Sequence, residues 1–325
     1  MRPFSFNKSG NLAKALQDKK TATQFIAGGT NLLELMKKQI AEPEAVIDIN
    51  SILSNSIEKT AKGIRIGAMT RNSIITMDKN VLTNYPLLAK AILAGASPQI
   101  RNMASTSGNL LQRTRCPYFY DTTTPCNKRK PGSGCSALQG DNRMSAIVGY
   151  SDQCVAVHPS DMCVALAALD ASVNTEGGLT LRSTIPFYKF HRLPGTTPQL
   201  DNNLPANALI LSIDIPANNF HKNYAYLKVR DRDSYAFALV SVAAALHLEG
   251  NKIIEARLAS GGVAHKPWRW YAAEQFLKGK EATADNFRAA AIVTINEVKT
   301  LPHNGFKKIM LQGAIETALQ NCLTA

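Results

Sequence analysis

The feature that most constrains the fold is a long stretch without hydrophobic periodicity, residues 116–153, which is rich in Pro, Gly, Asn, Asp, Thr and Ser. Segments with clear helix and strand patterns precede and follow it. A loop of this length is uncommon inside a compact domain unless it binds something or is disordered. Four of the six cysteines lie in it or just after it, at Cys116, Cys126, Cys135 and Cys154. The stretch therefore predicts a loop that binds something or is disordered.

Three kinds of chemistry could use these thiols. Disulfides suit an oxidising compartment, but a chain of 325 residues can bury enough core to do without two cross-links in one loop. Zinc accepts four cysteines, yet zinc ribbons pair their ligands in C-x₂₋₄-C turns, and here the intervening lengths are 9, 8 and 18 residues. A [4Fe-4S] cluster also takes four thiolates and suits widely spaced ligands. Spacing alone leaves zinc and iron open.

The surroundings of the thiols add to this picture. Pro117 and Pro125 stiffen the backbone beside two of them. Nearby cations would offset an anionic cluster and raise its reduction potential; they are Arg113, Arg115, Lys128, Arg129 and Lys130. The remaining cysteines, Cys163 and Cys322, sit on apolar helical segments and are predicted to be buried core thiols.

The patterned segments mix helices and strands. Before this loop we expect helices at 11–20, 30–40 and 85–96 and strands at 23–29, 45–49 and 63–70. After it we expect a strand and a helix within 154–171, a hairpin at 171–186 and a strand at 208–216. Pro and Asn gather at 216–223, which marks a domain boundary. Beyond it we expect strands at 224–230 and 237–264, turning at 249–251, and helices at 270–279, 284–295 and 304–323.

Three short motifs are candidates for binding an anionic cofactor. Gly28 and Gly29 lie between an apolar strand and a helix, where adjacent amides can cradle a phosphate, although a plain tight turn has the same pattern. The second motif is the hydrogen-bonding stretch 105–109, "STSGN". The third is Asp161 in "HPSDM", which could cap a helix or accept hydrogen bonds from sugar hydroxyls. The G-x-G-x-x-G spacing of nicotinamide-binding turns is absent around the glycine pair.

The order of these motifs resembles that of a known family. The segments "AGGTNLLELMKK", "IGAMT", "STSGNLL", "HPSDM", "YLKVRDRDSYAFALVSVAAAL" and "ASGGVAHKPWR" follow one another as in the FAD-binding subunits of molybdenum hydroxylases, which include xanthine dehydrogenase medium chains and carbon monoxide dehydrogenase flavoproteins. The resemblance implies an α+β fold. It consists of a two-subdomain FAD-binding domain of the vanillyl-alcohol-oxidase/PCMH type, residues 1–217 with subdomains of about 1–53 and 54–217, and a C-terminal α/β domain of the carbon monoxide dehydrogenase flavoprotein type, residues 221–325.

The resemblance also implies the residues that bind FAD. In this family both glycine turns bind the pyrophosphate, the Ser-Asp pair meets the sugar chain of the flavin, and a lysine lies near the isoalloxazine. Carried over, the FAD-binding residues are Ala27, Gly28, Gly29, Thr30, Asn31, Leu32, Thr106, Gly108, Asn109, Asp161 and Lys228. The chain departs from the family at Ser107, where the usual residue is Gly, so a contact there is not carried over.

The distance from Asn109 to Asp161 is much longer than in most of the family, and the excess is the cysteine-containing insertion. This resembles the subgroup typified by the FAD subunit of bacterial periplasmic aldehyde oxidoreductase, in which an inserted loop binds a [4Fe-4S] cluster. The implied insertion is 113–155, and the implied iron ligands are Cys116, Cys126, Cys135 and Cys154. Because the loop is an insertion, we expect Cys126→Ser to lower the iron content and leave FAD bound.

The implied function is that of an oxidoreductase subunit, with FAD and a [4Fe-4S] cluster as its cofactors. A large partner would hold the molybdenum cofactor, and a small partner would hold [2Fe-2S] centres. FAD here would pass electrons from those centres to an external acceptor, within a heterotrimer that oxidises an aldehyde or a xanthine-type substrate. The alternatives are a stand-alone FAD-dependent reductase or oxidase of the same fold, and a basic zinc-loop interaction module.

Charge and hydropathy bear on partners and location. The net charge of +13 is spread along the chain without a nucleic-acid-binding motif, so we expect no nucleic-acid partner. No apolar run is long enough to span a membrane, and the N-terminal residues do not resemble a signal peptide. The resemblance implies export to the periplasm together with a signal-bearing partner, with the cytoplasm as the alternative. His158, His265, Trp268 and Trp270 are expected to be structural.

Overall fold

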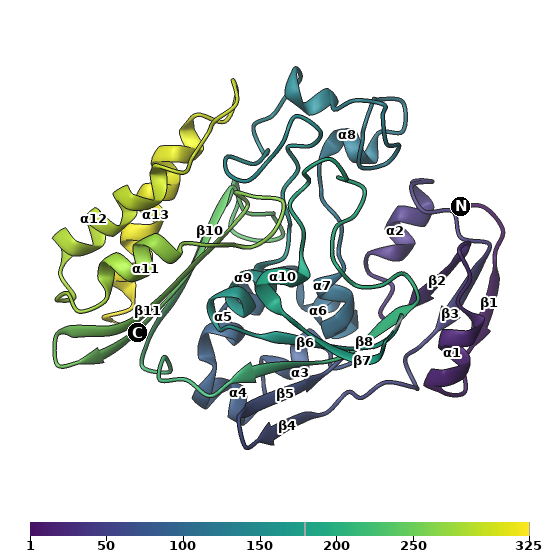
Figure 1. Cartoon of the computed structure of the whole chain (residues 1–325), viewed down its shortest axis with the longest axis horizontal. Helices are drawn as coiled ribbons and strands as arrows, with labels where there is room; N and C mark the ends of the chain where they lie inside the picture. The colour runs from purple at the N-terminus through teal and green to yellow at the C-terminus, as the bar shows by residue number, and fades with distance from the viewer. Residues whose placement is uncertain (179, 325) are drawn as a thin grey trace.

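The computed structural model describes residues 1–178 and 180–324. The N-terminal unit is a three-stranded parallel sheet of order β1-β3-β2 with two short helices (Figure 1). Its elements are β1 (Ser5–Lys8), α1 (Leu12–Asp18), β2 (Thr23–Ile26), α2 (Leu32–Lys37) and β3 (Ala45–Asp48). Asn11 begins α1 by accepting a hydrogen bond from the Lys14 amide at 2.9 Å. The strand, glycine turn and helix expected around Gly28 are therefore present.

The middle unit is a five-stranded antiparallel sheet of order β4-β5-β8-β6-β7, with helices against it. Its strands are β4 (Ile57–Thr60), β5 (Gly63–Gly67), β6 (Ser172–Gly177), β7 (Thr180–Pro186) and β8 (Ala208–Pro216). Its helices are α3 (Asn72–Ile75), α4 (Lys79–Asn84), α5 (Pro86–Ala94), α6 (Pro98–Met103), α7 (Thr106–Leu110), α9 (Asp161–Ala168) and α10 (Phe187–Phe190). The buried helix α9 lies at the centre of this unit, and every one of its residues is buried.

The C-terminal unit is a four-stranded antiparallel sheet of order β12-β11-β10-β9 packed against three helices. Its elements are β9 (Asn223–Val229), β10 (Val240–Glu249), β11 (Lys252–Gly261), β12 (Trp268–Arg269), α11 (Tyr271–Leu277), α12 (Ala284–Ile295) and α13 (Phe306–Asn321). Figure 1 shows these helices at the opposite end of the molecule from the N-terminal sheet. The three units confirm the predicted α+β class, and the gap between β8 and β9 falls within the expected boundary at 216–223.

The insertion is mostly irregular, as its composition predicts. It contains one turn of helix, α8 (Pro117–Tyr120), and a 3₁₀ turn, η1 (Ser136–Leu138). Phe119 of α8 is fully buried against Leu35 of α2, so the insertion is fixed to the N-terminal unit. The strand expected from residue 154 onward is wrong. The Val155 carbonyl accepts from the Ala146 amide at 2.8 Å and the His158 amide donates to the Ala264 carbonyl at 2.9 Å, so this apolar segment bonds to loops and joins no sheet.

Two large hydrophobic clusters fill the interior. One packs α5 and α9 against the middle sheet, and the other packs α11–α13 against the C-terminal sheet. Cys163 and Cys322 are fully buried within these clusters, as predicted. Across the described residues, no helix combines the length and apolarity that crossing a membrane would require.

Candidate functional site

The first glycine turn connects β2 to α2. Gly28 must be glycine, because a Cβ there would lie 1.9 Å from the Met103 carbonyl oxygen, and Gly29 has a positive φ of 72°. Asn31 precedes α2, and its side chain makes no cap hydrogen bond. The Asn31 Oδ1 atom is buried without a hydrogen-bond partner in the described part of the chain. A buried acceptor beside a turn of this kind is expected to meet a bound group or water.

Arg71 joins the first glycine turn to the second, and the sequence reasoning missed it. Its guanidinium donates to the Met103 carbonyl and, at 3.0 Å, to Asn50 Oδ1. Asn50 Nδ2 in turn donates to the Ala27 carbonyl at 3.1 Å. The Arg71 backbone forms a bridge with Ser105, at the start of the second turn. Arg71 thereby holds the two turns side by side, although they lie almost eighty residues apart in the sequence. No local sequence pattern around Arg71 predicts this contact.

The second turn is built around Ser105 and α7. Ser105 Oγ accepts a hydrogen bond from the Gly108 amide at 3.2 Å, which caps the short helix. Thr106 is fully buried, and its hydroxyl donates to the Thr70 carbonyl at 2.9 Å. Thr106 therefore anchors the turn with its side chain. At the other end of the turn, Asn109 Oδ1 accepts a hydrogen bond from Ser160 Oγ, so the turn leads directly to Asp161.

Asp161 and Lys228, predicted separately, form a buried ion pair. Lys228 Nζ donates to Asp161 Oδ2 at 2.8 Å and to the Ala94 carbonyl at 3.1 Å, and Tyr226 donates its hydroxyl to Asp161 Oδ1 at 2.7 Å. The two charged side chains are 5% and 8% exposed. Asp161 is not the helix cap, because Ser160 Oγ accepts from the Cys163 amide at 3.1 Å. Asp161 starts α9 and Lys228 lies on β9, so the pair joins two domains.

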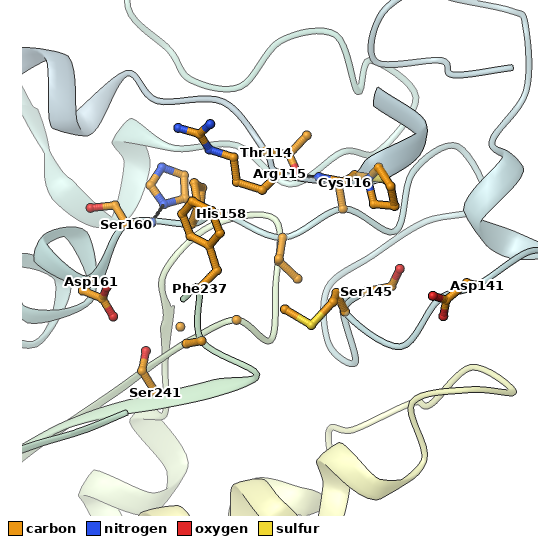
Figure 2. A pocket seen from close by; sticks show the side chains of 18 residues that line it. Thr114, Arg115, Cys116, Asp141, Ser145, His158, Ser160, Asp161, Phe237 and Ser241 are labelled. Carbon is orange, nitrogen blue, oxygen red and sulfur yellow. Dashed lines mark hydrogen bonds between the residues drawn. The ribbon is translucent and has the colours of Figure 1, made fainter. Parts of the chain in front are cut away.

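A pocket opens beside this ion pair (Figure 2). Figure 2 shows it extending from Ser160 and Asp161 at one end to Cys116 and Asp141 at the other, with Phe237 and Ser241 from the C-terminal domain along it. The insertion contributes a wall of the pocket, with Thr114, Arg115, Cys116, Pro117, Asp141, Met144 and Ser145. The insertion is therefore part of the wall of this pocket.

The four loop cysteines come together around a second, smaller cavity. Cys126 and Cys135 face each other in an isolated antiparallel bridge, and all four are free thiols. Cys116 and Ala156 line both cavities, so the cysteine group lies directly behind the wall of the larger pocket. The sequence prediction that these four thiols act as one group agrees with this arrangement.

The spacing of the sulfur atoms bears on what the group could hold. Among the described residues, no three of these thiols have ligand atoms that all lie within 4.8 Å of one another. A single zinc ion would need sulfurs closer than that, because four ligands about 2.3 Å from one metal are about 3.8 Å apart. A cluster binds each thiolate to a different iron and keeps the sulfurs further apart. A single zinc ion would therefore require these side chains to come closer together than they lie in the structure.

The pKa values of the thiols also bear on this site. Burial raises the pKa of Cys116 to about 11 and that of Cys154 to about 12, with the Lys128 charge opposing the rise at Cys154. Buried thiols of this kind stay protonated near neutral pH unless a metal replaces the proton.

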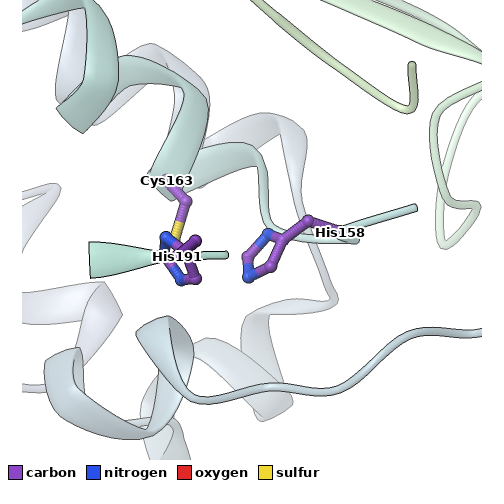
Figure 3. Close-up of side chains that lie close together, drawn as sticks. All are labelled: His158, Cys163 and His191. Carbon is purple, nitrogen blue, oxygen red and sulfur yellow. The ribbon is translucent and has the colours of Figure 1, made fainter. Parts of the chain in front are cut away.

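His158, Cys163 and His191 form a different buried group (Figure 3), in which the potential ligand atoms lie within 4.8 Å of one another. Sequence spacing did not reveal that the His158 and His191 rings are 4.4 Å apart. His158 Nδ1 accepts from the Ser160 amide at 3.3 Å, so its proton is on Nε2, and His191 Nε2 donates to the Leu110 carbonyl at 2.9 Å. Only His191 then offers a free nitrogen lone pair, and burial raises the pKa of Cys163 to about 12. The two rings are thus held in the core by burial and by hydrogen bonds to the backbone.

Comparisons with known families cover almost the whole chain. Residues 2–218 match the family described as the FAD binding domain in molybdopterin dehydrogenase. Residues 224–319 match the CO dehydrogenase flavoprotein C-terminal domain.

Individual relatives agree with these matches. The chain is 45% identical over 323 residues to the aldehyde oxidoreductase FAD-binding subunit PaoB of Escherichia coli K12, covering 98% of each chain. It is 27% identical over 273 residues to the carbon monoxide dehydrogenase medium chain of Hydrogenophaga pseudoflava, covering 84% of this chain and 78% of that one. The solved carbon monoxide dehydrogenase of the same organism superposes with a TM-score of 0.77 at 24% identity, covering 99% of this chain and 98% of that chain, which shows the shared fold. With both domains matched in order, the chain belongs to the FAD-binding medium subunits of the molybdenum hydroxylases.

Proposed function

We propose that this chain is the electron-transfer subunit of a heterotrimer. A large partner would carry the molybdenum cofactor, a small partner would carry [2Fe-2S] centres, and electrons would pass from those centres through FAD to an external acceptor. The observation that carries the proposal is the continuous line of contacts from the first glycine turn, through Arg71 and the second turn, to Asp161 and the pocket. An elongated dinucleotide needs a binding surface that extends in this way across several elements.

The residues along this line fit FAD. The amides of the first turn and the unpartnered Asn31 Oδ1 suit the diphosphate end, where that acceptor would meet a hydroxyl or a bridging water. The second turn, with Gly108 and Asn109, adjoins it. Ser160 and Asp161 would face the sugar chain, and the pocket between Phe237 and the insertion would hold the flavin ring. FAD supplies the redox chemistry, and these residues bind and orient it and exclude water.

We assign an aldehyde as the substrate of the complex. The assignment is supported by the 45% identity to the Escherichia coli relative, whose name specifies an aldehyde oxidoreductase. The substrate would be oxidised on the large partner, so no residue of this chain is expected to contact it.

We also propose that the four loop cysteines hold a [4Fe-4S] cluster. The support is their gathering around one cavity as four free thiols, together with the resemblance of the insertion to cluster-binding loops of the family. Iron, zinc and acid-labile sulfide should be measured in anaerobically purified protein. Four irons with matching sulfide are expected, and zinc without sulfide would contradict the cluster.

Co-purification tests the heterotrimer. An affinity tag on this chain, co-expressed with candidate large and small subunits, should recover both partners together with bound FAD. A folded chain that binds FAD, purifies alone and turns over a substrate by itself would support the stand-alone reductase or oxidase in place of the heterotrimer. A folded chain without any flavin absorbance would contradict both.

The proposed location is the periplasm, reached together with a partner that bears an export signal. Cell fractionation tests this directly. The chain should move to the periplasmic fraction when the signal-bearing partner is present and stay in the cytoplasm when that signal is deleted. A cytoplasmic chain in both strains would contradict co-export.

A further inference from the structure

Lys128 differs from the other basic residues of the insertion because its charge lies inside the protein. Its side chain is 1% exposed, and it lines the small cavity together with the four loop cysteines. Lys130, two residues later, is exposed to solvent. The Arg129 guanidinium is used to donate to the carbonyls of Tyr118 at 2.7 Å and Phe119 at 2.9 Å. Of the basic residues 128–130, Lys128 is therefore the one that lines the buried cavity of the four sulfurs.

The position of Lys128 is fixed by partners on a different segment. Lys128 Nζ donates to the Pro198 carbonyl at 2.8 Å and to Asp201 Oδ1. Arg113 Nε donates to the other carboxylate oxygen of Asp201 at 2.8 Å. Burial alone would raise the pKa of Asp201, but Lys128 and Arg113 hold it at about 2, so the carboxylate is ionised. Of these three charged groups, Lys128 lines the cavity of the thiols, and Asp201 lies directly against Lys128.

We propose that Lys128 and Asp201 set the reduction potential of the cluster held by Cys116, Cys126, Cys135 and Cys154, Lys128 raising it and Asp201 lowering it. The inference depends on the cluster proposed above. Neither residue is a ligand; both act through their charge, and Asp201 acts also by holding Lys128 in place.

The physical basis is the response of a buried redox centre to nearby fixed charge. Four thiolates make the cluster anionic, and reduction adds a further negative charge. A cation in the same desolvated cavity stabilises the reduced form more than the oxidised form, because little water screens it. An anion held next to that cation has the opposite effect. A solvent-exposed cation such as Lys130 is screened and has a smaller effect.

Opposite signs make the inference testable. Lys128→Met and Asp201→Asn break the same ion pair, so a purely structural loosening of the loop would shift the cluster potential in the same direction in both variants. The charge effect predicts a lower midpoint potential for Lys128→Met and a higher one for Asp201→Asn. Lys130→Met is the matched control and should shift the potential less than either. The measurement is a redox titration of the intact heterotrimer monitored by EPR, with the flavin and [2Fe-2S] signals as internal references.

The outcomes separate this inference from the cluster assignment. Wild-type protein without a [4Fe-4S] signal refutes the cluster itself. The inference is overturned if the wild-type signal is present but the midpoint potentials of Lys128→Met and Asp201→Asn shift in the same direction. It is also overturned if neither shifts more than that of the Lys130→Met control. If Lys128→Met does not retain iron, Lys128→Gln replaces it, because its amide can still donate to the Pro198 carbonyl. The midpoint potential of Asp201→Asn must still rise.

Discussion

Replacing Lys228 by Met tests whether the ion pair with Asp161 holds the two domains together. The variant removes the donor to Asp161 Oδ2 and leaves that buried carboxylate with only the Tyr226 hydroxyl. Because both side chains are more than nine-tenths buried, the cost should follow that of a broken buried pair, about 3–5 kcal/mol in the free energy of unfolding. The double variant Asp161→Asn/Lys228→Met should lose less, because it leaves no uncompensated charge.

The assay is urea unfolding of the purified chain, followed by circular dichroism and flavin release. Arg65→Met is the matched control, since it also removes a cation from an ion pair, here with Asp214 at 2.7 Å. Those side chains are 47% and 32% exposed, so the expected loss is about 1 kcal/mol or less. Equal losses for Lys228→Met and Arg65→Met would refute the claim that burial makes the Asp161 pair important.

Three further predictions follow from the same contacts. Cys126→Ser should abolish most iron binding. Sequence alone predicts that FAD stays bound in this variant, but Cys116 and its neighbours line both cavities, so we now expect FAD affinity to fall several-fold; unchanged affinity would contradict a flavin ring placed against this wall. Gly28→Ala should destabilise the chain by about 1–3 kcal/mol and release FAD, because the added Cβ would collide with the Met103 carbonyl. Gly10→Ala is the control: it has open space around it and should change neither the melting temperature nor the bound FAD. Burial lowers the pKa of His191 from 6.5 to about 4. The free energy of unfolding should therefore be fully retained above pH 6.5 and fall by about 3 kcal/mol as the pH drops to 4, because the imidazole takes up a proton more readily in the unfolded chain. Urea midpoints measured across this range should depend less on pH in His191→Phe.

Much of the fold was predictable from local patterns. The strand, glycine turn and helix around Gly28, the hairpin β6-β7 and the C-terminal strands with their turn at Gly250 all follow from hydrophobic periodicity and turn residues. Strand β4 was missed because its four residues, "IEKT", are too few and too polar to give a clear alternation. The strand expected after Cys154 failed for a different reason. Val155 and Ala156 are apolar because they fill a cavity wall and the core, and apolarity alone does not provide a pairing strand.

The candidate site was predictable as a set of motifs but not as an arrangement. The glycines, Asp161, Lys228 and the four cysteines could each be identified from sequence and family resemblance. Their pairing could not, because it depends on contacts between distant segments. Arg71 links the two turns, and Lys128 meets Asp201 across more than seventy residues. The proximity of His191 to His158 is likewise a consequence of how α9 packs beside α10.

The central claim is that this chain carries electrons from its partners to FAD, and anaerobic reduction of the flavin by an aldehyde tests it most directly. In the intact heterotrimer, adding the aldehyde should bleach the oxidised flavin absorbance near 450 nm, about as far as dithionite does. The isolated chain loaded with FAD should be bleached by dithionite but not by the aldehyde. Bleaching of the isolated chain by the aldehyde would contradict the account. So would an intact complex that, with no external acceptor present, oxidises the aldehyde while its flavin stays oxidised.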